Sequence, residues 1–81
     1  MEDQMYISIK SFCRAHEIGL DFIEEVLEYE LIEVQKTEDD LLLPEEQLER
    51  LERILRLHYE LGINMPGIDV ILRLLERFYS F

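Results

Sequence analysis

The chain is poor in cysteine, glycine and proline, and these shortages exclude an internal disulfide and a flexible linker. The single cysteine, Cys13, cannot form an internal disulfide, which is consistent with a reducing compartment. Three glycines and two prolines among 81 residues provide no flexible linker, and no repeat or low-complexity tract is present. We therefore expect one domain, residues 1–81, which is a normal size for a small domain.

Long apolar runs are also missing. No run approaches the ~20 residues that a helix needs to cross a bilayer. The first ten residues, MEDQMYISIK, lack the basic-then-apolar pattern of a secretory signal. These absences predict a cytoplasmic protein without membrane contact.

Basic residues are the most informative shortage. The chain has 19 acidic and 8 basic residues, which gives a net charge of −11 at pH 7. Nucleic-acid binders neutralise phosphates with Lys and Arg, and an anionic membrane would repel this chain in the same way. Nucleic acid is therefore a poor candidate partner, whereas a basic protein surface would be attracted.

What is present is an apolar fraction of 48%, typical of a globular protein, arranged at mainly helical spacing. Ser8 can cap the amide of Ser11, so the first helix is predicted to begin after Ser8. A tight turn follows at residues 17–19, and Leu20 opens a second helix. Two short helices joined in this way form a helix-turn-helix.

Residues 31–43 alternate apolar and polar side chains around the polar tip KTEDD, which predicts a β-hairpin, or wing. Pro44 then opens a long helix that Gly62 ends. The exposed face of this helix predicts three i, i+4 ion pairs: Glu46–Arg50, Glu49–Arg53 and Glu52–Arg56. Pro66 begins a last helix that runs to about Tyr79. The predicted fold is mainly α, with about four helices and a small β-hairpin wing.

The second helix, LDFIEEVLEYEL, contains no basic residue. At 100° per residue its acids form one stripe within about 100° of arc: Asp21, Glu24, Glu25 and Glu28. One interpretation is a solubilising face, and the other is a docking stripe for basic side chains. The absence of compensating bases favours the docking stripe.

Several residues could in principle carry chemistry. Cys13 and His16 have a C-x-x-H spacing, but a structural zinc site needs four ligands and only the distant His58 remains. We expect Cys13 in the core, His16 on the surface and His58 partly buried with its hydrogen bonds satisfied. No nucleophile–base pairing or phosphate-binding loop is present. These patterns predict a non-enzyme without metal or cofactor.

The last helix is apolar over roughly 200° of its circumference, whereas a surface helix needs little more than ~100°. Its core side is predicted to comprise Ile68, Ile71, Leu72 and Leu75. A surplus side remains, made of Val70, Leu74 and Phe81. This side predicts a homodimer or second interface, unless the helix is sandwiched deeply within its own domain.

The order of helix, turn, acidic helix, wing and long helix resembles the MerR-like helix-turn-helix superfamily. A closer resemblance is to the CbpM family of chaperone modulators. It rests on SFCRAHEIG, LEYELIEV and above all RLHYELGINMPGIDVILRLLE, residues 56–76. The chain departs from that family at Glu30, where the family usually has glycine.

The CbpM resemblance implies that the protein binds the J-domain of a CbpA-type co-chaperone. Binding of this kind would inhibit the stimulation of a DnaK-type chaperone. The assignment of the acidic stripe as the contact comes from its charge and not from the resemblance. The alternative is a MerR-like DNA-binding transcriptional regulator, in which only basic residues outside the second helix, such as Lys10, Arg14 and Lys36, could touch phosphate.

Overall fold

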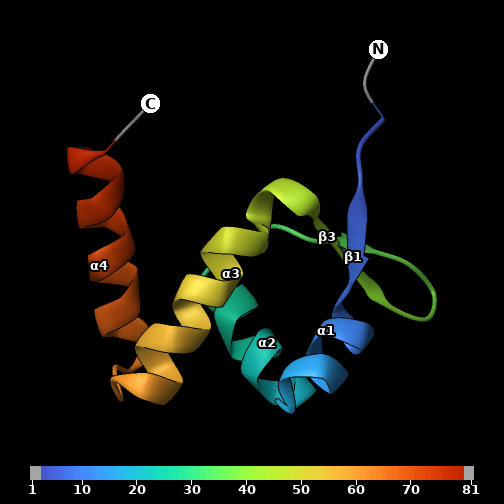
Figure 1. Ribbon diagram of the computed structural model, residues 1–81, viewed down its shortest axis with the longest axis horizontal. Coiled ribbons are helices and arrows are strands. Elements are labelled where there is room, and N and C mark those ends of the chain that lie inside the picture. The colour runs from blue at the N-terminus through green and yellow to red at the C-terminus, as the bar shows by residue number, and fades with distance from the viewer. Residues whose placement is uncertain (1–2, 80–81) are drawn as a thin grey trace.

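In a computed structural model that describes residues 3–79, the chain folds into helices with a small antiparallel sheet at one side (Figure 1). The elements are β1 Tyr6–Ser8, α1 Ile9–His16, α2 Leu20–Glu28, β2 Gln35–Lys36, β3 Leu41–Pro44, α3 Leu48–Leu55 and α4 Met65–Phe78. A 3₁₀ turn, Glu45–Gln47, precedes α3, and a π-helical turn, Arg56–Glu60, extends it. The prediction of a mainly α, winged helix-turn-helix is confirmed.

The helix-turn-helix begins where the capping pattern places it. The Ser8 hydroxyl accepts a hydrogen bond from the Ser11 amide at 3.1 Å, so one amide of the first turn is satisfied. At the other end of α1, Glu17 adopts a left-handed conformation with φ 54°. The amide of Ile18 then bonds the carbonyl of Cys13 at 3.0 Å, and the chain turns into α2.

The wing is a hairpin of β2 and β3, as predicted, but residues 31–34 lie outside its strands and a third strand joins it. Contrary to the prediction, Pro44 ends β3 and does not open the long helix. The strand order is β1-β3-β2, with Ile7 opposite Leu43 and Gln35 opposite Leu42. The sequence analysis did not predict β1. Its pairing places β3 in the centre of the sheet, where Leu43 is fully buried.

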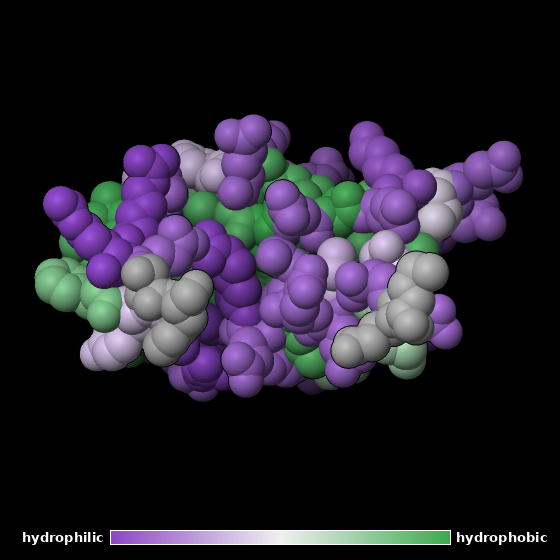
Figure 2. Space-filling model, turned by 90° about the horizontal axis from the view of Figure 1, so that it is seen from above, coloured by the Kyte–Doolittle hydropathy of each residue, from purple (hydrophilic) through white to green (hydrophobic). Residues whose placement is uncertain are grey.

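One apolar core joins the sheet to the helices. Its buried members are Ile9, Phe12, Cys13, Phe22, Ile23, Val26, Leu31, Ile32, Leu43, Leu51, Ile54, Leu55, Met65, Ile68 and Leu72. Hydrophilic side chains cover most of the face seen in Figure 2, with hydrophobic groups visible between them. The helix α4 lies at one side of the molecule and the wing at the other (Figure 1).

Arg50 of α3 connects two parts of this fold that are distant in sequence. Its Nε donates a hydrogen bond to the carbonyl of Leu31, just after α2, and its Nη1 donates to Glu76 Oε1 of α4 at 2.7 Å. The sequence analysis predicted Glu46 as the partner of Arg50. Within residues 3–79 the ion pairs are instead Arg50–Glu76 and Arg73–Asp69. Glu46 lies in the 3₁₀ turn before α3, so the i, i+4 spacing expected on one continuous α-helix does not apply to it and Arg50.

Two glutamates occupy backbone positions suited to glycine. Glu17 and Glu30 follow α1 and α2 with φ of 54° and 55°. The left-handed conformation costs a residue with a Cβ roughly 1–2 kcal/mol, and glycine avoids this cost. Glu30 therefore keeps the geometry that glycine would favour after α2.

We predict that Glu30→Gly raises the free energy of unfolding by about 1 kcal/mol relative to Glu30→Gln, measured by urea denaturation. The glutamine variant removes the same charge and leaves the Cβ, so the difference reports the backbone alone. Gly62 provides the converse control, because its φ is 67° and no atom within 4 Å would meet an added Cβ. Gly62→Ala should destabilise the protein, and stabilisation of that variant would contradict the backbone explanation.

We also predict that Arg50→Met destabilises the domain by roughly 1.5–3 kcal/mol, because hydrogen bonds to a charged donor are lost and the Leu31 carbonyl loses a partner. Glu76→Gln retains an acceptor for Nη1 and should cost less than about 1 kcal/mol, as expected for an exposed ion pair. Thermal unfolding followed by circular dichroism compares the two variants. Equal losses would show that the Leu31 contact contributes nothing.

Candidate functional site

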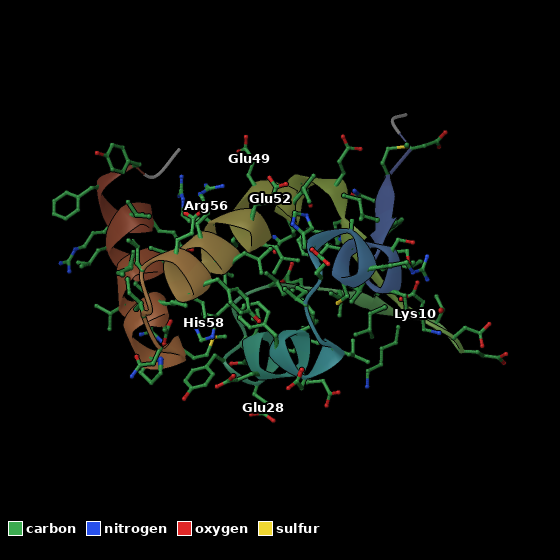
Figure 3. All side chains as sticks on the ribbon, turned by 60° about the horizontal axis from the view of Figure 1, so that its bottom comes forward. Lys10, Glu28, Glu49, Glu52, Arg56 and His58 are labelled. Atoms are coloured by element: carbon green, nitrogen blue, oxygen red, sulfur yellow. The ribbon has the colours of Figure 1, made fainter. Side chains whose placement is uncertain are left out.

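The outer face of α2 carries all four acids predicted from the sequence. Asp21, Glu24, Glu25 and Glu28 are exposed, while the opposite face of the helix buries Phe22, Ile23 and Val26. Figure 3 shows the side chain of Glu28 pointing away from the body of the protein. The predicted stripe is therefore solvent-facing.

These carboxylates have no basic partner along the part of the chain that the structure describes. Both ion pairs of residues 3–79 lie on α3 and α4, and α2 has no basic residue in its last turn. The N-terminal end of the helix dipole favours Asp21, whereas Glu28 lies at the unfavourable end. A cation brought to this face would thus meet uncompensated negative charge.

The four acids fall into two pairs with different neighbours. Asp21 and Glu25 are on the side of α2 near Tyr59, in the π-helical turn that follows α3. Burial raises the pKa of Tyr59 there, and the negative charges of Asp21 and Glu25 raise it further. The rings of Phe22, His58 and Tyr59 pack together at this place, with centroids 4.8–5.2 Å apart.

Glu24 and Glu28 face the wing and help to line a groove of about 600 Å³ between α2 and the sheet. We call this feature the α2–wing groove. Its lining residues are Lys10, Leu20, Glu24, Leu27, Glu28, Lys36, Asp39, Asp40 and Leu41. The sequence analysis missed this groove, because it exists only once the wing is placed beside α2.

Asp40 holds the wing wall of the groove in place. Its carboxylate accepts hydrogen bonds from the Ser8 hydroxyl, from the Lys10 amide at 3.1 Å and from the Leu41 amide at 2.7 Å. The bond from Ser8 is the main reason that the pKa of Asp40 lies below its ordinary value, and the two amides act in the same direction. One side chain thus joins the hairpin to the first turn of α1.

The other candidate residues take ordinary structural positions. Cys13 is buried, and burial raises the pKa of its thiol. His16 is exposed against the Phe12 ring, with centroids 4.2 Å apart. His58 is half-buried, and its Nδ1 lies 3.0 Å from the carbonyl of Ile63. No group of three His, Cys, Asp or Glu side chains within residues 3–79 could hold a metal ion.

The predicted second interface on α4 is exposed at the two of its three residues that the structure describes. Val70 and Leu74 are 56% and 46% exposed, and Phe78 extends the same apolar surface. Phe81, the third predicted residue, lies outside the described residues. Among the described helices, none has the length and apolar character of a membrane-spanning segment.

The fold and site define a winged helix-turn-helix protein whose second helix presents acids where a DNA-reading helix presents bases. Residues 7–80 match the family described as MerR HTH family regulatory protein, so the chain belongs to that family. Comparison with curated proteins and with solved structures found no match.

We predict that the stability difference between the natural protein and Asp40→Asn depends on pH. A folded-state pKa below the unfolded value means that the carboxylate stabilises the fold above about pH 4, and that this stabilisation is lost as pH falls through the folded-state pKa. Asp40→Asn should therefore be less stable at pH 7, and the two proteins should converge in acid. Urea denaturation between pH 2.5 and 7 measures this, and a pH-independent difference would contradict it.

Proposed function

We propose that this MerR-family protein acts by binding protein and not DNA. It would dock the acidic face of α2 on the basic surface of a J-domain and lower the stimulation of a DnaK-type chaperone by a CbpA-type co-chaperone. The resemblance to the CbpM family supplies the identity of the partner. The observation that carries the proposal is the set of four exposed carboxylates on α2, none of which forms an ion pair within residues 3–79.

Such a face favours a cationic protein for a simple electrostatic reason. In water a pair of unit charges 4 Å apart interacts by about 1 kcal/mol, and several pairs add to both the encounter rate and the affinity. The interaction should weaken as salt shortens the Debye length. A net charge of −11 attracts the same partner from outside contact range.

Inhibition by this route requires no chemistry. The CbpM resemblance implies that the J-domain presents a basic helix to its DnaK-type partner. A protein that covers that helix withholds it from the chaperone, so the inhibitor needs only affinity and a suitably shaped surface. The absence of a nucleophile–base pairing from the sequence agrees with this role.

Membership of the MerR family supports a second candidate, a DNA-binding regulator. Lys10 and Lys36 do lie at the α2–wing groove, where a winged helix could approach a duplex. Glu24 and Glu28 line the same groove, however, and would be brought close to the phosphates. The electrostatics of the groove favour the protein partner.

The double reversal Glu24→Lys, Glu25→Lys tests the proposal. It should weaken binding to a CbpA-type J-domain protein about tenfold or more, because a loss of ~1.4 kcal/mol corresponds to a factor of ten. Isothermal titration calorimetry at two salt concentrations measures the affinity. Glu45→Lys, Glu46→Lys is a matched control, since it reverses two adjacent exposed acids and changes the net charge equally.

The control should lose much less affinity than the α2 variant, and both should retain their helical circular dichroism. Equal loss in the two variants would indicate a general charge effect and not a contact at α2. A gel-shift titration at low salt belongs beside this experiment. Retardation of duplex DNA by the natural protein would support the regulator instead.

A further inference from the structure

We infer that the α2–wing groove receives one face of an amphipathic basic helix, with an apolar side chain between the leucines and Lys or Arg against Glu24 and Glu28. The inference rests on the proposed function and deepens it, because it states which side chains a partner helix must present. It also assigns a binding role to Leu20, Leu27 and Leu41, which the acidic stripe alone does not include.

The apolar part of the groove comes from two separate elements. Leu20 in the first turn of α2 is 46% exposed, and Leu27 of α2 and Leu41 of β3 are half-buried. All three line the same 600 Å³ space. An apolar side chain that enters there would remove these leucines from water, and the burial of apolar surface favours binding.

The charges around the groove differ between its two walls. The α2 wall carries Glu24 and Glu28, while Lys10 of α1 and Lys36 of β2 lie on the opposite side. Figure 3 shows Glu28 on α2 and Lys10 on α1, so the two side chains come from different elements of the groove. Asp39 and Asp40 also lie on that side, but the two lysines offset their charges, so the wing wall is less negative than α2. A partner would therefore place its bases along α2.

A helix fits these features better than a strand or a duplex. Glu24 and Glu28 are spaced i, i+4, and the same spacing on a partner helix presents two basic side chains to them. The outer strand β2 has only two residues, Gln35–Lys36, so it offers little edge for an added strand. A duplex would set phosphates against Glu24 and Glu28 and would leave the leucines without apolar contacts.

A synthetic probe helix tests the inference directly. Its leucines stand at i and i+4 and its lysines one position further on, at i+1 and i+5. A second peptide has serine in place of the leucines and keeps the charge. NMR titration of the isotope-labelled full chain should show shifts at Leu20, Leu27 and Leu41, with the leucine peptide binding at least fivefold more tightly than the serine peptide.

The matched protein variants are Leu20→Ala and Leu74→Ala, because both leucines are on helices and 46% exposed. Leu20→Ala should weaken binding of the leucine peptide about fivefold, and Leu74→Ala should leave it unchanged. Equal affinity for the two peptides, equal effects of the two variants, or shifts confined to α4 would overturn the inference. A DNA duplex that shifts the groove residues would overturn it as well.

Titration of a J-domain protein separates this inference from the proposed function. If Glu24→Lys, Glu25→Lys weakens that complex while Leu20→Ala does not, the function stands and the leucine contact is wrong. If the leucine peptide binds as expected but the J-domain protein does not bind, the inference that the groove binds a helix stands and the proposed J-domain partner is wrong. Loss of J-domain binding in both variants supports both statements.

Discussion

Burial of one face of α2 is the constraint on which the site depends. Phe22, Ile23 and Val26 are at most 5% exposed, and they fix the rotation of the helix about its axis. Once these three side chains are inside, Asp21, Glu24, Glu25 and Glu28 must face solvent, because the two sets occupy different sides of a 3.6-residue repeat. The hydrophobic core thus sets the direction of the negative face. In a helix-turn-helix that direction is the one in which the second helix meets its ligand.

Local signals in the sequence were sufficient to predict most of the helical frame. The Ser8 cap, the turn before Leu20 and the stop at Gly62 each depend on neighbouring residues alone, and the structure confirms them. Strand β1 could not be found in this way. Tyr6–Ser8 is too short to show a period, and it is ordered by pairing with β3, more than thirty residues later in the chain. The predicted ion-pair partner of Arg50 was wrong for a related reason, since its acceptors on Leu31 and Glu76 are both distant in sequence.

The candidate site was predictable to a similar extent. Periodicity places the four acids on one face of α2, and the structure exposes all of them. Their division into two pairs depends on what lies on each side of the helix. Leu41 lies at the groove because Asp40 and the pairing of β3 with β1 hold the hairpin beside the start of α1, and no pattern within residues 31–43 predicts those contacts. Leu20 lines the groove for the same reason, because the wing lies beside the first turn of α2.

The central position of β3 limits where the chain can be truncated or fused to another protein. Leu41, Leu42 and Leu43 form an apolar run that is shielded on one side by β1 and on the other by β2. Deleting or displacing Tyr6–Ser8 would leave the backbone groups of that run open to a strand from another molecule, a recognised route to aggregation. Strand β1 thus protects the sheet against self-association. Truncations and fusion junctions should leave this strand in place.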